Sequence, residues 1–311
     1  EGLLAYVKPK SKTAELKKQK RYKRSTTKSN TSGSLDKTLK LYIGGKQVRP
    51  DSGYSKAVFG PKGFITHIGD GNRKDIRNAV EAAHKAGNWS KTSGHLRAQI
   101  LYYLAENLDK RSSEFIENII LSTGVKKEVA QKEVETSISR LFYYAAWADK
   151  FDGAVHDVPI RGVTLAMNEP LGVVAVICPE ENPLLGLVSL AAPLIAMGNT
   201  CVLIPSASSP NIAANFYQVL DTSDVPAGVL NIITGEEEAF VKTLSEHHDI
   251  AAIWYFGAGN NSGEIERFST ASLKRTWVNN NKTRNWHSNG QGKEFLNNAT
   301  DVKNIWIPYG E

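Results

Sequence analysis

The stretch Leu171–Gly257 contains four apolar segments typical of buried strands: VVAVIC (173–178), TCVLIP (200–205), VLNIIT (229–234) and AAIWYF (251–256). Three helical patterns separate them: LLGLVSLAAPLIAMG (184–198), NIAANFYQVL (211–220) and EAFVKTLSEH (238–247). Strand and helix alternate with short connections, which predicts an α/β domain with a doubly wound, Rossmann-like parallel sheet. Ligands of such sheets bind beyond the carboxyl ends of the strands, which here are Pro179, Pro205, Gly235 and Gly257.

Two further regions precede this unit. LYIGGKQV (41–48) and FITHIGD (64–70) alternate like strands, and we expect them to form one small N-terminal sheet. Three helix faces then follow in the sequence: Ile76, Val80 and Ala83; Leu96, Ile100, Tyr103, Leu104 and Leu108; and Phe115, Ile116, Ile119 and Ile120. After Ala148, FDGAVHDVPI (151–160) and GVTLAMNEP (162–170) predict a β-ribbon.

The positive net charge of +6 is concentrated at the N-terminus. Residues 1–38 hold 11 Lys and Arg against three acids, which leaves 27 bases and 29 acids in residues 39–311. The run KKQKRYKR (17–24) therefore reads as part of a solvated linker, and a nucleic-acid or nuclear-localisation patch is the alternative. The folded part itself is slightly acidic.

The composition fits a folded protein of a reducing compartment such as the cytoplasm. Hydrophobic residues make up 41% of the 311 positions, and the two cysteines, Cys178 and Cys201, lie in apolar strand patterns that suggest no disulfide. We expect no membrane span and no signal sequence. Because the chain starts at Glu1, without Met, a fragment of a longer protein is one interpretation.

Five segments resemble the aldehyde dehydrogenase superfamily, in family order and at family spacing, between Leu39 and Ser272. They are FYYAAWADKFDG (142–153), EPLGVVAVICPEENPLL (169–185), AAPLIAMGNTCVLIP (191–205), VPAGVLNIITG (225–235) and IWYFGAG (253–259). The resemblance implies an NAD(P)-binding type of domain and, at about residues 148–170, an oligomerisation ribbon. It implies NAD(P) as the family's cofactor, but we expect no cofactor in this chain alone.

The end of the chain carries a second resemblance. GQGKEFLNNATDVKNIWIP (290–308) is similar to the extreme carboxyl end of these enzymes, and only TWVNNNKTRNWHSN (276–289) joins it to the coenzyme-type unit. The resemblance therefore implies that the catalytic domain is missing, although the point of excision is ambiguous. EGLLAYVKP (1–9) resembles the end of another module. This arrangement resembles the carboxyl-terminal half of the aldehyde dehydrogenase 16 family. The expected domains are the end of a preceding module (1–10), a flexible linker (11–38), a truncated domain (39–290) and a tail strand (291–311).

The resemblance also implies that the chemistry of aldehyde oxidation is lost. The nucleophile belongs to the missing segment, and neither cysteine replaces it. The oxyanion donor of the family is an asparagine in Pro-Trp-Asn-Phe-Pro, and in this chain Glu181 stands at that position within residues 179–183. A carboxylate repels a developing oxyanion. Asn182 lies one place out of register, and a shifted loop that brings it in is the alternative.

Base and coenzyme positions are degenerate as well. Asn279 stands where the family has its glutamate base; a second alignment places TWVN on a later family strand, and neither supplies a base. In the cleft formed by Pro179, Ile204, Ser206, Gly235 and Gly257, the ribose-binding lysine is replaced by Ile204 and the nearby glutamate by Ala207. The two glycines fit either fold maintenance or retained nucleotide binding.

Other polar residues predict no site. The seven histidines show no metal-ligand spacing, so we expect no metal, and Glu236–Glu238 fit the start of a helix. The leading hypothesis is a non-catalytic domain that serves assembly with a preceding aldehyde dehydrogenase module, in a parent that is a homodimer and contacts other proteins. The alternative is part of an active NAD-dependent aldehyde dehydrogenase. Nucleic-acid tethering through residues 8–28 ranks last.

Overall fold

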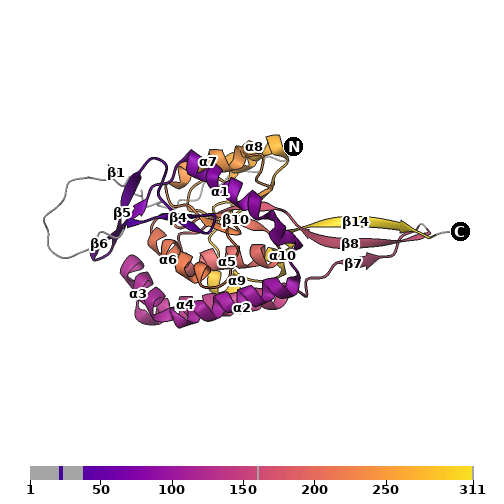
Figure 1. Cartoon of the computed structure of the whole chain (residues 1–311), viewed down its shortest axis with the longest axis horizontal. Coiled ribbons are helices and arrows are strands. Elements are labelled where there is room, and N and C mark those ends of the chain that lie inside the picture. Colours follow the sequence, from indigo (N-terminus) through magenta and orange to yellow (C-terminus); the bar gives the residue numbers. More distant parts are fainter. Residues whose placement is uncertain (1–20, 24–37, 160, 310–311) are drawn as a thin grey trace, which may run out of the picture.

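The central element is a seven-stranded sheet, which Figure 1 shows between two layers of helices. The computed structural model describes residues 21–23, 38–159 and 161–309. The strand order is β13-β12-β9-β10-β11-β3-β4. Five strands run parallel: β9 (Val173–Ile177), β10 (Thr200–Ile204), β11 (Leu230–Ile232), β12 (Ala252–Tyr255) and β13 (Arg275–Val278). The predicted α/β sheet is confirmed.

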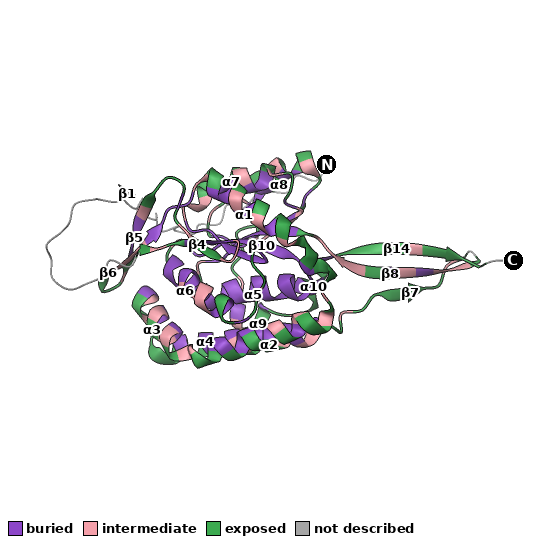
Figure 2. Ribbon diagram, viewed as in Figure 1, coloured by how far each residue is buried: buried purple, intermediate pink, exposed green. Residues whose placement is uncertain are grey.

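Alternate side chains of these strands enter two separate cores. Val174 and Val176 pack under α5 (Pro183–Ala196) and α6 (Pro210–Asp221), on the face that α2, α3 and α4 also cover. Val173 and Ala175 face the other core, made with α1 (Arg73–Lys85), α7 (Glu237–Glu246) and α8 (Ser262–Ser269). α5 and the strands β9, β10, β11 and β12 are buried along their whole length (Figure 2). Burial on both faces explains why the strands are continuously apolar.

The prediction of one small N-terminal sheet is wrong. LYIGGKQV forms the hairpin of β3 (Leu41–Ile43) and β4 (Lys46–Val48), and β3 extends the central sheet by pairing antiparallel to β11. FITHIGD lies in β6 (Gly63–Gly69), which belongs to a separate sheet of order β1-β5-β6-β2. Sequence proximity suggested one sheet, but strand pairing is decided by contacts with distant elements.

The second sheet also includes a strand that we did not predict. β1 (Arg21–Lys23) pairs antiparallel with β5 (Tyr54–Gly60), and β2 (Thr38–Leu39) pairs with β6. These three residues of β1 fall in the segment expected to be a flexible linker. The rest of the predicted linker up to residue 37, and the predicted module end at 1–10, lie outside the described residues.

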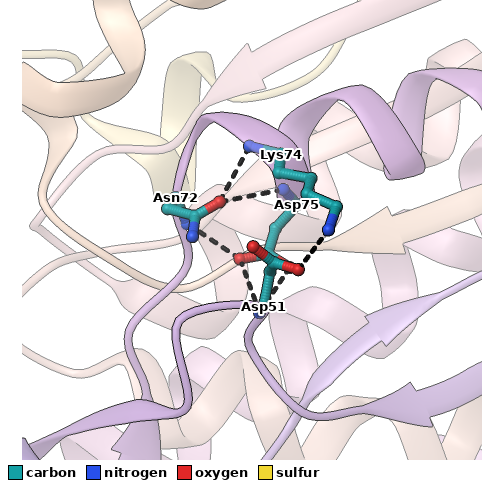
Figure 3. A network of polar contacts seen from close by, with 4 residues as sticks. All are labelled: Asp51, Asn72, Lys74 and Asp75. Carbon is teal, nitrogen blue, oxygen red and sulfur yellow. Dashed lines mark hydrogen bonds and ion pairs between the residues drawn. The ribbon is translucent and has the colours of Figure 1, made fainter.

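The helices of the N-terminal half pack largely as predicted. α1 begins at a capping box in which Asn72 accepts hydrogen bonds from the backbone nitrogens of Lys74 and Asp75, while Asp75 accepts from that of Asn72 (Figure 3). α2 (Gly94–Lys110), α3 (Ser112–Thr123) and α4 (Lys127–Trp147) follow, with short 3₁₀ helices at Ala86–Lys91 and Thr270–Ser272. On α2 the predicted face is partly wrong, because Leu96 and Tyr103 are exposed and Leu101 is buried instead.

A third sheet projects from the body of the molecule (Figure 1). Its order is β14-β8-β7, with β7 (Ala154–His156), β8 (Gly162–Pro170) and β14 (Thr300–Pro308). β7 and β8 lie in the segment for which a ribbon was predicted. The tail prediction needs a correction, because the segment from 291 begins with the helix α10 (Lys293–Asn298), which follows α9 (Trp286–Asn289), before β14 starts. Among the helices described, none is long and apolar enough to cross a membrane.

Candidate functional site

The residues predicted to form the cleft lie along one edge of the central sheet. Backbone hydrogen bonds join neighbouring strand ends: Cys178 donates to Ile204, Phe256 to Ile177 and Asn279 to Tyr255. Pro179, Ile204, Gly257 and Asn279 therefore lie side by side at the carboxyl edge, and Gly235 follows β11 two strands away from β9. Strand order alone brings these positions together, as it does in other doubly wound folds.

The two glycines of this edge are packed against the protein itself. A Cβ at Gly235 would lie 2.5 Å from the Phe240 ring, and a Cβ at Gly257 would lie 2.5 Å from a carboxylate oxygen of Glu237. A side chain at Gly235 would collide with the buried Phe240 ring, whereas one at Gly257 would have to move the carboxylate of Glu237.

Glu180 lies in the turn between β9 and α5, and its side chain reaches the loop between β10 and α6. Its carboxylate accepts hydrogen bonds from the Ser206 hydroxyl at 2.7 Å and from the backbone nitrogens of Ala207 at 2.7 Å and Ser208 at 2.9 Å. Ser206 and Ala207 are two of the positions where the resemblance implies coenzyme contacts. No role was predicted for Glu180.

The next two residues of the turn between β9 and α5 point away from the loop that Glu180 contacts. Glu181 is exposed. Asn182 has left-handed backbone angles, with φ of 50°, and its side-chain nitrogen lies 3.5 Å from the carboxylate of Glu133 on α4. The same carboxylate accepts from the backbone nitrogens of Leu184 and Leu185 at the start of α5. The Asn182 amide is thus engaged with a buried carboxylate, which argues against the alternative that it serves as an oxyanion donor.

A second carboxylate, Glu237, lies in the cleft at the start of α7. Its Oε1 is 2.6 Å from the Tyr255 hydroxyl and 2.9 Å from the side-chain nitrogen of Asn261, and the Tyr255 hydroxyl is also 2.5 Å from the Gly259 carbonyl oxygen. The Tyr255 hydroxyl therefore lies between two close acceptors, the Glu237 carboxylate and the Gly259 carbonyl oxygen. Burial raises the pKa of Glu237, and the charge of Glu180 adds to this rise. The predicted helix start at Glu236–Glu238 is confirmed, but its contribution to the cleft was missed.

Asn279 ties the end of β13 to its neighbour. Its side-chain nitrogen donates to the Gly257 carbonyl oxygen at 3.0 Å, and its side-chain oxygen accepts from the backbone nitrogen of Asn281 at 3.2 Å. Amide groups at this position cannot take up a proton as a carboxylate base would. The Asn279 side chain thus links the end of β13 to Gly257, the residue that follows β12 and Phe256.

The two thiols are inaccessible. Cys178 and Cys201 are buried, and desolvation raises the pKa of both. A thiol kept neutral and away from solvent is a poor nucleophile. Within the described part of the chain no group of three or more His, Cys, Asp or Glu is arranged to hold a metal ion.

The edge just described belongs to a fold shared with known proteins. The family model described as "Aldehyde dehydrogenase family" matches residues 57–280, well over half of the chain. The chain belongs to the aldehyde dehydrogenase family. Sequence relatives include an aldehyde dehydrogenase of Agaricus bisporus, 34% identical over 233 residues, which are 73% of this chain and 46% of that protein. The cytosolic 10-formyltetrahydrofolate dehydrogenase of Mus musculus is 30% identical over 72% of this chain and 26% of its own length.

Solved structures of aldehyde dehydrogenases show the same fold. The NAD⁺ complex of the aldehyde dehydrogenase from Bacillus cereus has a TM-score of 0.74 at 24% identity, covering 78% of this chain and 51% of that one. Betaine aldehyde dehydrogenase from Staphylococcus aureus, also with NAD⁺, has a TM-score of 0.73 at 24% identity, covering 78% and 50%. The chain thus spans about half the length, or less, of the aldehyde dehydrogenases that it matches.

Residues that the aldehyde dehydrogenase resemblance did not single out contribute most of the hydrogen bonds of the site. The carboxylates of Glu133, Glu180 and Glu237 lie at or beside the starts of α5, α6 and α7, respectively. One signal was available for Glu133: it lies on the face of α4 that also carries the apolar residues Val134 and Leu141. A charged residue in such a stripe indicates a specific buried partner.

Proposed function

We propose that this chain is a non-catalytic aldehyde dehydrogenase-like domain that serves assembly and interaction within a longer aldehyde dehydrogenase family protein. The observation that carries the proposal is the projecting sheet β14-β8-β7, which leaves the outer edges of β14 and β7 without a neighbour among the described residues. Open strand edges pair readily with another chain.

The side chains of this sheet favour the same role. Val155, Val302 and Trp306 are 72%, 60% and 58% exposed, and Met167, Ile307 and Tyr309 are exposed as well. Apolar side chains gathered on a projecting element indicate an interaction surface. We propose that the oligomerisation role of the segment about 148–170, which the resemblance implies, belongs to this sheet together with β14.

The cleft supports a loss of chemistry. Glu181 and Asn279 stand at the positions of the oxyanion donor and the base, and both cysteines are buried. After β13 ends at Val278, only residues 279–285 precede α9 and the tail. We propose that the catalytic domain is missing here, that the chain is the carboxyl-terminal pseudo-domain of an aldehyde dehydrogenase 16 type parent, and that Pro179, Ile204, Ser206, Gly235 and Gly257 form a degenerate coenzyme cleft.

The partner in this proposal is the preceding aldehyde dehydrogenase module of the same parent, with the parent a cytoplasmic homodimer that also contacts other proteins. Neither a membrane nor a nucleic acid is a partner in it, and residues 8–28 lie outside the described residues except for β1. The test compares the parent with and without residues 39–311. We expect deletion to lower the number of chains per assembly, which is the mass from light scattering divided by the mass of one chain. An unchanged number of chains together with unchanged aldehyde turnover would contradict the assembly role.

The alternative function keeps NAD chemistry. In it, the parent is an active NAD-dependent aldehyde dehydrogenase, its catalytic residues lie in the preceding module, and the present domain still binds nucleotide. The solved structures that share the fold include NAD⁺ complexes, which is the observation in its favour. Calorimetric titration of the chain with NAD separates the two: saturable heat supports the alternative, and its absence supports the non-catalytic role.

A further inference from the structure

The loop between β10 and α6 has the features of an anion-binding site. Two backbone nitrogens, of Ala207 and Ser208, and the hydroxyl of Ser206 converge on one point, which the carboxylate of Glu180 occupies at 2.7 to 2.9 Å. Ser206 is buried, and its hydroxyl also accepts from the backbone nitrogen of Ser209 at 3.2 Å. The donor set is therefore held rigidly by the fold, as an anion site requires.

We infer that Glu180 is a built-in ligand of this loop, which fills its anion-binding position and so determines that the cleft rejects anionic solutes. α6 has 12 residues, and its N-cap, Ser209, makes no side-chain capping bond. The Glu180 carboxylate, which comes from the turn after β9, places a negative charge in the loop just before the start of α6. A diphosphate at this edge would have to displace a carboxylate that is covalently part of the protein.

The remaining charges of the edge oppose replacement by an external anion. The carboxylate of Glu237 packs against Gly257, and the charge of Glu180 acts on it. Glu181 is exposed beside Glu180. An anionic ligand that entered the loop would meet this acidic surrounding as well as the Glu180 carboxylate. The inference rests on the proposed function only in taking the cleft to hold no coenzyme.

The site can nevertheless be reached from solvent. Ser208 is exposed, and Glu180 and Ala207 are half-buried. Removal of the carboxylate should therefore expose three preorganised donors to small anions. The position of Glu181, one residue along the same turn, offers a control in which the same charge is removed without freeing a donor.

The experiment is a titration of the full chain with inorganic pyrophosphate at constant ionic strength, followed by calorimetry and thermal unfolding. We expect no saturable binding to the wild type or to Glu181→Ala. We expect Glu180→Ala to bind at least about tenfold more tightly than either, as freed charge-assisted hydrogen bonds allow. Pyrophosphate should also raise the Tm of Glu180→Ala, because it replaces the lost carboxylate, and leave the Tm of the wild type unchanged.

A second variant covers the outcome in which Glu180→Ala does not fold. Glu180→Gln keeps one acceptor oxygen for the loop but removes the charge, and we expect it to fold and to bind pyrophosphate more tightly than Glu181→Ala. Equal binding by Glu180→Gln and Glu181→Ala would overturn the inference, and so would saturable binding to the wild type. Either result would leave the assembly role untouched, since that role is tested by the mass of the parent.

Discussion

The carboxylate of Glu133 lies 3.0 Å from the backbone nitrogen of Leu184, although the two residues are 51 positions apart in the chain. α5 begins after Asn182, which makes no side-chain capping bond, so Glu133 supplies the cap from α4. We expect Glu133→Ala to lower the free energy of unfolding by about 1–3 kcal/mol, because it leaves buried amide groups without an acceptor. Chemical denaturation measures this. Glu133→Gln keeps an acceptor and is the matched control; an equal loss in both variants would contradict the capping role.

The same residue should make stability depend on pH. Burial raises the pKa of Glu133 above its ordinary value in the unfolded chain. The folded state then holds the proton more tightly, so stability falls as pH rises from the ordinary glutamic acid range of about 4.3 through the higher folded pKa. The side chain of Glu133→Gln cannot ionise. The free energy of unfolding of the wild type should therefore fall relative to that of Glu133→Gln as the pH rises across this window. Parallel pH profiles for the two proteins would argue against the effect.

Arg140 should hold the segment after β13 against the body. This buried guanidinium donates to the Ser189 hydroxyl at 2.6 Å, to the Trp286 carbonyl oxygen at 2.8 Å and to the Gln291 side chain at 3.3 Å. We expect Arg140→Ala to cost about 2–4 kcal/mol, as removal of a buried hydrogen-bonding centre does, and to speed hydrogen exchange in α9 and α10.

A control for Arg140 lies on α1. Arg77 is exposed and pairs with Glu81 one helical turn away, so Arg77→Ala should change stability by less than about 0.5 kcal/mol. If the two alanine variants lose the same stability, or if exchange in α9 and α10 stays at the wild-type rate in Arg140→Ala, the anchoring role is wrong.

The start of α1 provides a separable test of capping. Asp75 is buried and accepts from the backbone nitrogens of Asn72 and Asp51, as Figure 3 shows. Asn72→Ala should cost about 1 kcal/mol, and Asp75→Ala should cost more because it also releases the Asp51 turn. Lys74→Ala removes only the exposed ion pair with Asp51 and should be nearly neutral. In thermal unfolding, the Tm should fall most in Asp75→Ala, less in Asn72→Ala and least in Lys74→Ala.

Charge placed on the projecting sheet should separate assembly from folding. Val302 and Trp306 lie on one face of β14 and are exposed. A Val302→Lys, Trp306→Lys double variant should fold with an unchanged Tm but should lower the mass of the parent assembly. Phe64→Lys alters an aromatic residue that is also exposed, at 54%, in another sheet. It should leave the mass unchanged; a shift of mass in this control alone would point to a different interface.

The sequence was informative where apolar periodicity repeats. The four strand patterns between 171 and 257 correspond to β9, β10, β11 and β12. Strands that are buried on both faces are apolar along their whole length, so their patterns are easy to recognise. It was less informative for the hairpin at 41–48, since the pairing of β3 with β11 joins Tyr42 to Ile232, far along the chain. Nothing local in the hairpin encodes that contact.

The candidate site shows the same division. Its backbone positions follow from strand order, so Pro179, Pro205, Gly235 and Gly257 could be placed at the carboxyl ends of the strands in advance, whereas Asn279 could not, because β13 was not predicted. The directions of side chains could not. Glu180 and Glu181 are adjacent and chemically identical, yet one fills the loop of Ala207 and the other faces solvent. Only the path of the turn between β9 and α5 decides which of them is bound.

The long pairing of β14 with β8 has a consequence for synthesis of the chain. Lys303 of β14 contacts Glu169 of β8, and 134 positions separate them. At the usual speed of a ribosome, β8 waits on the order of ten seconds for its partner strand to be made. During that time its open edge is available to other nascent chains, so association with a neighbour can begin before the polypeptide is finished. A nonsense codon between the codons for β8 and β14 would make that waiting state permanent.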